Sequence, residues 1–498
     1  MRKCSWLLAL LLIGSLMLSV CACGQVGDLE EVYEDDGEPY EIVYYMVYND
    51  ANLPQDITSV ENALNKILKK EINATIDIYA YTLAEYTSKV SGAIAATVKF
   101  DVCFTSPEIN PYITNVQREA FLPLDYLLPT YAPETWAGID QSMWDQARVN
   151  GKIYGSINEQ IYPRSFGLDF RTALHIGDYL DEFYPGTATD NVYLKLKEQN
   201  KSAFEFVTEY LTWMRDNDRG AGGRISGLDT ESTLQNLYGF DNLCTGISTP
   251  GVVNINDDTY TVVNQFETKE YEEMIDQAYA WKEAGFLKSG SAYDITPESN
   301  WKPGYRQDTC VKLSDPHYFT SYIIGTMNAI SSTSENPARA MKFIELMRTN
   351  AEVHNLLQFG VEDVHYIKDP DNTNRILQYV EGSGYNNAQF GWGLGSEFVS
   401  LLQPNQPDDV WEQVKKINEE TPMTGLIGFN FDATNVKQKI ADCRAVTNEY
   451  MSALASAEFI DKDAKLEEFR DRLDKAGADE IIAEKQRQLN EFLAAKQK

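Results

Sequence analysis

The chain has 498 residues, which is enough for two or three domains with cores of their own. Hydrophobic residues make up 43% of it, which excludes a protein that is disordered throughout. The 75 acidic and 43 basic residues give a net charge of −32, so the surface repels nucleic acid and anionic lipid headgroups. We therefore expect no nucleic-acid partner.

The N-terminus predicts a secretory leader that ends in a lipidation site. Two basic residues precede the Leu-rich run 6–20, which has the length of a signal-peptide core and is too short to span a membrane comfortably. The run ends in "VCACG", which resembles the lipobox of bacterial lipoproteins. Cys23 fits the modified position better than Cys21, because Ala22 precedes it and Gly24 follows it. A diacylglycerol thioether would anchor the mature chain, of net charge −34, to the outer face of the membrane. The alternative is that both thiols are incidental in a discarded leader.

The next segment, 24–39, is acidic, contains glycine and has no periodicity, so it predicts a flexible tether. Strand and helix patterns then alternate, with strands expected at 40–48, 74–82 and 101–106 and helices at 56–70 and 83–98. This alternation predicts βαβ units and a parallel sheet.

The middle of the chain is mainly helical in pattern, with helices expected at 202–217, 269–285 and 334–350. The first opens with a capping box, Ser202 to Glu205. After Asp432 the apolar residues recur at spacings of three and four, which predicts three amphipathic helices broken at Gly477. Their apolar faces need a partner. We expect them to brace one lobe of the same chain, and docking onto a transporter is the alternative.

Motifs for catalysis and metal binding are missing from the sequence. There is no G-x-S-x-G elbow, no H-E-x-x-H and no P-loop. The histidines are isolated, which favours structural or surface roles: His175, His317, His354 and His365. The cysteines beyond the leader form no CxxC pair, which favours ordinary thiols but leaves disulfide pairings open: Cys103, Cys244, Cys310 and Cys443. We expect no catalytic residue, metal or cofactor.

Binding chemistry is better represented, because 12% of the residues are aromatic and several follow predicted strands. Ligands collect at the carboxyl ends of parallel strands. The residues that we expect to bind a ligand lie after the strands, after the motif "NGKIYG", or on later loops: Tyr48, Asn49, Asp50, Ser106, Glu108, Asn158, Glu159, Trp301 and Trp392. For both tryptophans packing is an equal alternative, and for Asn158 and Glu159 a structural role near a hinge is the alternative.

Segments along most of the chain resemble the extracellular solute-binding lipoproteins of bacterial ABC importers, in particular the LipO-like (LplA-like) group. They are "REAFLPLDYLLPTYAP" from Arg118, "VNGKIYGSIN" from Val149, "AISSTSENPARAMKFIELM" from Ala329, "LLQFGVEDVHY" from Leu356 and "LIGFNFDATNVKQKIADC" from Leu426. The last of these opens a C-terminal domain typical of the group.

The resemblance implies an α/β, bilobed type II periplasmic-binding-protein fold with hinge crossovers and a C-terminal helical extension. The expected division is signal peptide 1–22, tether 23–39, first lobe 40–157 and 313–378, second lobe 158–312 and 379–432, and C-terminal helical region 433–498.

It also implies a protein that is not an enzyme and that delivers a carbohydrate to membrane permeases of an ABC importer. We expect a neutral oligosaccharide, because the acidic chain disfavours an anionic one, and a monomer that touches the membrane through its lipid anchor only. The alternatives are a lipid-anchored glycoside hydrolase and a lipoprotein that binds peptides or amino acids.

Overall fold

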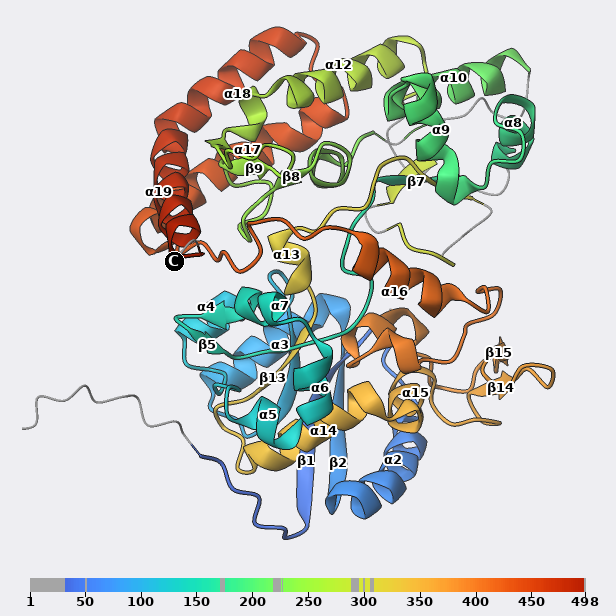
Figure 1. Ribbon diagram of the computed structural model, residues 1–498, viewed down its shortest axis with the longest axis vertical. Coiled ribbons are helices and arrows are strands. Elements are labelled where there is room, and N and C mark those ends of the chain that lie inside the picture. The colour runs from blue at the N-terminus through green and yellow to red at the C-terminus, as the bar shows by residue number, and fades with distance from the viewer. Residues whose placement is uncertain are drawn as a thin grey trace, which may run out of the picture.

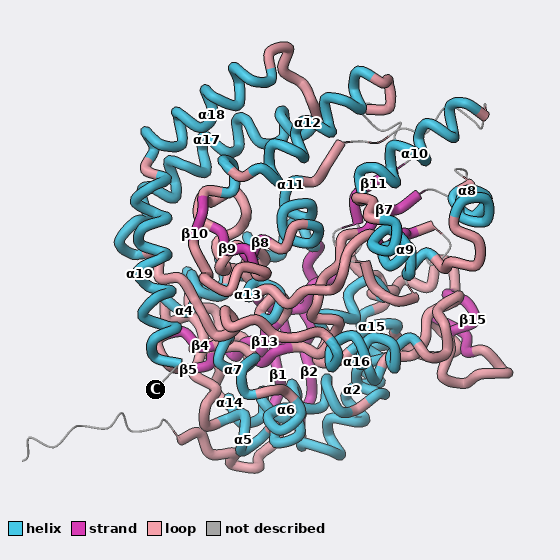
Figure 2. The backbone as a smooth tube through the Cα atoms, turned by 45° about the horizontal axis from the view of Figure 1, so that its top comes forward, coloured by secondary structure: helices cyan, strands magenta, loops and turns pink. Residues whose placement is uncertain are grey.

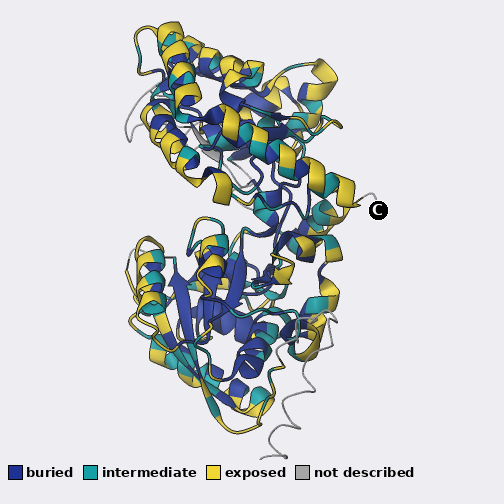
Figure 3. Cartoon of the chain, turned by 90° about the vertical axis from the view of Figure 1, so that its left-hand side faces the viewer, coloured by how far each residue is buried: buried dark blue, intermediate teal, exposed yellow. Residues whose placement is uncertain are grey.

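The computed structural model describes residues 32–49, 52–170, 175–217, 225, 227–287, 295–298, 301–304 and 309–496. Buried apolar side chains in these ranges form two large cores, visible as two dark-centred bodies in Figure 3. We call them the first lobe, which is the lower body in Figure 1, and the second lobe, the upper body. Within the described ranges, no helix combines the length and the apolar character that crossing a membrane requires.

The first lobe is built on a five-stranded sheet of order β2-β1-β3-β13-β6. Its strands are β1 (Tyr40–Tyr48), β2 (Ala74–Thr82), β3 (Val102–Thr105), β13 (Met327–Ile330) and β6 (Ser156–Ile157). β1 is parallel to β2 and β3, as predicted, but β13 is antiparallel to both of its neighbours. The expected parallel arrangement therefore holds for the three predicted strands, and the sheet as a whole is mixed. The chain returns from the second lobe into β13, so Met327 starts opposite Thr105, at the carboxyl end of β3.

Helices cover this sheet on both sides (Figure 1). They are α2 (Ile57–Ile72), α3 (Leu83–Ala95), α4 (Tyr112–Gln117), α5 (Leu127–Tyr131), α6 (Pro133–Gly138), α7 (Gln141–Gln146), α14 (Pro337–Thr349) and α15 (Ala351–Phe359). The first lobe also carries the short hairpins β4–β5 (Arg148–Val149, Lys152–Ile153) and β14–β15 (Tyr366–Lys368, Ile376–Tyr379) and the 3-10 turns η5 (Ala388–Gly393) and η6 (Glu397–Val399). At the start of α14, Asn336 Oδ1 accepts a hydrogen bond from Arg339 N at 2.9 Å.

The end of the predicted tether is not free. Asp35 accepts hydrogen bonds from Arg339 Nη2 at 2.5 Å and from Lys342 Nζ at 2.6 Å, and these contacts hold the pKa of its carboxyl well below the usual range. Tyr131 Oη donates to Tyr33 O at 2.8 Å. Because the Arg339 side chain is almost wholly buried, it needs an anionic partner, and Asp35 provides one. The expectation of a flexible segment through residue 39 is therefore wrong for residues 33–38.

The second lobe combines small sheets with helices. Its strands form the sheets β10-β9-β8 and β11-β7-β12, with β7 (Gly167–Phe170), β8 (Phe240–Asp241), β9 (Val252–Asn254), β10 (Val262–Val263), β11 (Ile295–Glu298) and β12 (Cys310–Lys312). Its helical elements before the C-terminal region are α8 (Ile176–Phe183), η2 (Thr189–Asn191), α9 (Val192–Gln199), α10 (Ala203–Asp216), α11 (Thr230–Ser232), η3 (Thr233–Leu237), η4 (Gln265–Glu267) and α12 (Lys269–Glu283). The predicted capping box of α10 is formed in both directions.

The C-terminal region folds into η7 (Thr434–Val436) and three helices, α17 (Lys437–Ala455), α18 (Lys462–Ala476) and α19 (Ala478–Lys496). Figure 1 shows them stacked on the outer side of the second lobe. Their apolar side chains are part of the second-lobe core, where Phe469 meets Phe266 edge-on at 4.9 Å and Tyr450 stacks on Phe469 at 5.4 Å. The expected docking onto one lobe of the same chain is what the structure has.

The chain passes between the lobes after Ile157, before α13 (Thr320–Ile323), and around α16 (Val410–Glu420), as the central part of Figure 2 shows. The first two crossings pair with each other, since Arg164 and His317 exchange both backbone hydrogen bonds at 2.8 and 2.9 Å. Not all of 379–432 belongs to the second lobe as expected. Tyr385, Phe390 and Leu394 pack in the first-lobe core, because Asn387, between them, bonds to the backbone at the end of β1.

Candidate functional site

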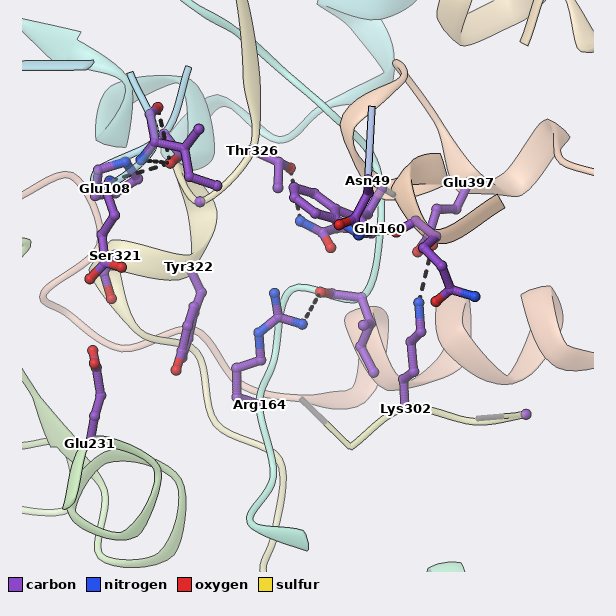
Figure 4. A pocket seen from close by; sticks show the side chains of 18 of the residues that line it. Asn49, Glu108, Gln160, Arg164, Glu231, Lys302, Ser321, Tyr322, Thr326 and Glu397 are labelled. Atoms are coloured by element: carbon purple, nitrogen blue, oxygen red, sulfur yellow. Dashed lines mark hydrogen bonds and ion pairs between the residues drawn. The ribbon is translucent and has the colours of Figure 1, made fainter. Parts of the chain in front are cut away.

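A cavity of about 1380 Å³ lies between the two lobes. The first lobe supplies residues that follow β1 and β3, the crossings supply the middle, and the second lobe and α17 supply the opposite wall. The principal lining side chains are Asn49, Ser106, Glu108, Gln160, Arg164, Glu231, Asn242, Thr245, Lys302, Tyr322, Thr326, Trp392, Glu397, Trp411, Arg444 and Asn448. Figure 4 shows Glu108 and Glu231 pointing toward each other from opposite sides, at the end of the cavity away from Lys302 and Glu397.

Four of the predicted ligand-binding residues line this cavity: Asn49, Ser106, Glu108 and Trp392. The Ser106 hydroxyl accepts hydrogen bonds from Ile109 N at 2.8 Å and Glu108 N at 3.3 Å, and so shapes the loop that presents the exposed Glu108. The positions after β1 and β3 meet at the cavity because the two strands are parallel.

Four other predicted residues do not line it. Tyr48 is buried, and its hydroxyl accepts a hydrogen bond from Asn386 N at 2.7 Å. Asn158 accepts from Asn328 Nδ2 at 2.7 Å, and Glu159 forms an ion pair of 2.8 Å with Arg348. Trp301 is buried against Lys312, whose Nζ lies 4.7 Å from the ring. For Asn158, Glu159 and Trp301 these contacts favour the structural roles that the sequence left open. For Tyr48 the sequence offered no such alternative, and its burial at the end of β1 takes it out of the cavity lining. Asp50 and Cys23 lie outside the described residues.

Arg164 is the main cavity residue that sequence reasoning missed. It lies on a crossing segment, is buried, and donates from Nη1 to Ile161 O at 3.0 Å. Its guanidinium stands over the Tyr322 ring at 4.7 Å, while its Nε has no hydrogen-bond partner in the described part of the chain. Burial lowers the pKa of the guanidinium. No local pattern signals this residue, because its burial arises from the pairing of two segments far apart in sequence.

Two other residues that line the cavity carry a buried polar atom without a hydrogen-bond partner among the described residues. These atoms are the Asn242 side-chain oxygen and the Ser321 hydroxyl. Unpaired buried polar groups are costly, so each of these atoms gains if a rearrangement on ligand binding gives it a partner.

One end of the cavity is acidic. Glu231 lies on α11, and burial raises the pKa of its carboxyl to about 7, with the nearby carboxylates of Glu108 and Asp229 adding to the shift. Burial lowers the pKa of the Arg444 guanidinium on α17, the carboxylate of Glu108 opposes that shift, and the positive charge of Arg444 offsets part of the acidity at this end.

Two tryptophans also line the cavity. Trp392 is half-buried, contacts Phe390 and Phe104 edge-on, and donates from Nε1 to Gln389 O at 2.9 Å. Trp411 of α16 is half-buried as well, packs edge-on against Phe398, and donates to Ser400 O at 3.2 Å. Both indoles are thus held in place while part of each remains exposed in the cavity.

Within the described ranges, no three His, Cys, Asp or Glu side chains are grouped to hold a metal ion. Cys103, Cys244 and Cys443 are free thiols, as favoured from the sequence, and Cys310 is buried on β12. Only Cys244 lies at the cavity, and burial raises the pKa of its thiol to about 12, which makes it a poor nucleophile.

Comparison with known proteins agrees with this architecture. The chain is 22% identical, over 97% of its length and 97% of the relative, to a carbohydrate ABC transporter substrate-binding protein of Streptococcus pneumoniae serotype 4. It is similar to the crystal structure of the N-glycan transport solute binding protein NgtS of Streptococcus pneumoniae, with a TM-score of 0.76, 21% identity, and coverage of 92% of this chain and 100% of that one. For NgtS in complex with Man5GlcNAc the TM-score is 0.67 at 21% identity, with 92% and 99% coverage.

The chain has the fold of the bilobed solute-binding proteins. Residues 425–494 match the model of a domain of unknown function, DUF3502, which coincides with α17 to α19 and the segment before them. The resemblance stated from the sequence is confirmed, including its C-terminal domain. In this solute-binding fold the cavity occupies the space between the lobes, and the paired crossings form its floor.

Proposed function

We propose that this protein is an extracellular solute-binding protein that captures an oligosaccharide between its lobes and delivers it to an ABC importer. The observation that carries the proposal is the composition of one cavity, whose lining combines the half-buried indoles of Trp392 and Trp411 with polar side chains, among them Asn49, Arg444 and Asn448. Sugar rings present flat C–H surfaces to indoles and hydroxyls to polar side chains.

The size of the cavity favours a ligand of several sugar units. Its 1380 Å³ exceeds the range of about 300 to 1,000 Å³ typical of small-molecule pockets. The relatives point the same way, since one is named for carbohydrate transport and another was solved with Man5GlcNAc.

We propose that the ligand is neutral. The acidic side chains Glu108, Asp169, Glu231 and Glu397 line the cavity together with Arg164, Lys302 and Arg444. Lys302 is already paired with Glu397 at 3.2 Å, and the whole chain carries a net charge of −32. An anionic sugar would therefore meet a repulsive field.

Calorimetry with Man5GlcNAc, maltopentaose, cellopentaose and short peptides tests the proposal. We expect at least one of the neutral oligosaccharides to bind and to raise the melting temperature. At a hundredfold excess over Kd, binding should add about 2.7 kcal/mol to the free energy of unfolding. Trp392→Ala and Trp411→Ala should each weaken that binding about tenfold, through lost stacking. Phe183→Ala, which removes an exposed aromatic ring outside the cavity, is the control. Tight binding of peptides alone would overturn the proposal.

We propose further that the protein is not an enzyme, acts as a monomer and has no cofactor. The competing function is glycoside hydrolysis, because Glu108 and Glu231 are carboxyl groups that face each other and differ in environment. Incubation of the same oligosaccharides with the protein, followed by chromatography, distinguishes the two. We expect each sugar to be recovered intact, and release of shorter products that stops in Glu231→Gln would favour the hydrolase.

The lipid anchor at Cys23 is also a proposal, supported by Ala22 before it and Gly24 after it. Cys23→Ser should release the protein into the medium or leave the leader uncut, while Cys21→Ser should be processed and anchored normally. The reverse pattern in membrane fractionation would assign the anchor to Cys21.

A further inference from the structure

The C-terminal domain reaches the ligand cavity directly. Arg444 and Asn448 are one helical turn apart on α17, and both line the cavity. They belong to the 425–494 segment whose family model carries no assigned function. The domain is therefore both a brace on the outside of the second lobe and part of the wall of the binding site.

Arg444 is held in position by the second lobe. Its Nε donates to Thr249 Oγ1 at 2.9 Å and its Nη2 donates to Thr245 O at 2.6 Å. Nη1 makes no hydrogen bond within the described ranges and remains available to a ligand oxygen. The Asn448 side chain, exposed and likewise without a hydrogen bond there, offers a donor and an acceptor.

A second cation of the same domain fixes the loop that Arg444 contacts. Lys485 of α19 is fully buried and donates to Thr245 Oγ1 at 2.8 Å and to Gly251 O at 2.5 Å. Gly251 has φ of +100°, and a Cβ there would lie 2.8 Å from Lys485 Cδ, so only glycine fits. The loop residues Thr245, Gly246 and Ser248 line the cavity, and their backbone is thus set by the C-terminal domain.

Glu108 points toward Glu231 at the end of the cavity opposite Lys302 and Glu397. The carboxylate of Glu108 acts electrostatically on Arg444, so the wall formed by α17 belongs to this end. Trp411 belongs to the opposite end, because it donates to Ser400 O, just after Glu397 and the turn η6. One end therefore offers an indole face, and the other offers carboxyl, guanidinium and amide groups. A ligand that fills both ends must be longer than one that occupies the aromatic end alone.

We propose that Arg444 and Asn448 are ligand-contacting residues, and that the C-terminal domain thereby makes this protein prefer long oligosaccharides over short ones. The inference rests on the proposed function. Arg444 donates to a hydroxyl or carbonyl oxygen of the sugar unit farthest from Trp411, and Asn448 bonds to a neighbouring hydroxyl. The ligand is thus held by stacking at one end and by hydrogen bonds to the C-terminal domain at the other.

The test compares two lengths of one sugar. The probes are the member of the panel above that binds most tightly and the disaccharide with the same linkage. Arg444→Ala and Asn448→Ala should each weaken binding of the longer sugar about tenfold, because each removes a hydrogen bond to the ligand. Binding of the disaccharide should change less than twofold. Arg487→Ala and Asn490→Ala on α19 are matched controls, because both side chains bond only within that helix.

The possible outcomes distinguish a failure of this inference from a failure of the proposed function. If the variants bind the longer sugar as tightly as the unmodified protein does, the inference is wrong and the proposed function stands. If they lose both lengths equally, α17 acts by supporting the lobe and not by contacting the ligand. If the unmodified protein binds no member of the panel, the proposed function and this inference fall together. Asn448→Ala keeps the test open if Arg444→Ala fails to fold, since the Asn448 side chain is exposed and makes no hydrogen bond within the described ranges.

Discussion

At the scale of single residues, Lys485 makes stability depend on pH in a defined way. Burial, with repulsion from Arg444, lowers the pKa of its ammonium from the ordinary 10.5 to about 7. Between pH 7 and 10.5 the unfolded chain therefore binds a proton that the folded chain does not, and folding becomes more favourable as pH rises. Below pH 7 the group is charged in both states and the dependence ends.

We expect the free energy of unfolding of the unmodified protein to rise from pH 7 to pH 9.5 relative to that of Lys485→Met, which cannot titrate. Urea unfolding at several pH values measures the difference. Lys437→Met, at an exposed lysine of α17, should show no such trend. If the difference in free energy of unfolding between Lys485→Met and the unmodified protein is the same at every pH, the buried ammonium keeps its proton.

Replacing Trp301 by alanine should affect stability, and replacing Trp392 by alanine should affect ligand affinity. Trp301 is 5% exposed and packs against Lys312, so Trp301→Ala should lower the free energy of unfolding by about 3 to 5 kcal/mol and leave sugar affinity unchanged. Trp392→Ala should lower affinity and cost less stability, because its ring is half-exposed. Urea titration with calorimetry on both variants separates the roles, and weaker binding by a folded Trp301→Ala protein would contradict them.

At the scale of elements, the C-terminal helices should be required for the stability of the second lobe. Their side chains, among them Tyr450, Phe469 and Leu489, are part of its core. A chain that stops after Asp432 would expose that core, so we expect a lower melting temperature and binding of a hydrophobic dye. A chain that stops after Ala476 and retains α17 and α18 is the comparison. If the chain that stops after Asp432 keeps the melting temperature and the ligand affinity of the full chain, the C-terminal helices do not brace the second lobe.

The local elements were largely predictable from sequence. The strands β1 and β2 have the predicted bounds, and the capping box of α10 and the break at Gly477 lie where their patterns indicate. These features depend on neighbouring residues, which a sequence pattern records. The direction of β13 and the contact between Asp35 and Arg339 join residues that are far apart in the chain, so no local pattern signals them.

The same distinction holds for the site. Asn49, Ser106 and Glu108 were found because strand ends are readable and parallel strands end together. Arg164, Arg444 and Trp411 were missed because each enters the cavity through the packing of one segment on another. Trp301 was misplaced for a related reason, since a tryptophan outside a helical stripe can pack or bind, and only its neighbours decide.

At the scale of the whole molecule, Gln146 links the lobes. It is fully buried in the first lobe, donates to Phe429 O at 2.9 Å, and accepts from Gly428 N at 2.7 Å. Gln146→Ala would leave these buried groups unpaired, so we expect a loss of about 1 to 3 kcal/mol in unfolding free energy.

The same variant should widen the range of lobe separations seen by small-angle X-ray scattering of the ligand-free protein. The exposed Gln141→Ala in α7 is the control. Scattering curves that coincide with those of the unmodified protein would show that the other crossings alone set the angle between the lobes.

The hydrogen bonds of Asp35 to α14 also limit the distance between the first lobe and the bilayer. With the proposed lipid at Cys23, the nine residues from Gly24 to Val32 would separate the anchor from the first lobe by about 30 Å at most, whatever their conformation. The first lobe would then remain close to the lipid headgroups. Such confinement keeps a loaded protein at a high local concentration near its membrane partner, so repeated encounters replace a search through bulk solution.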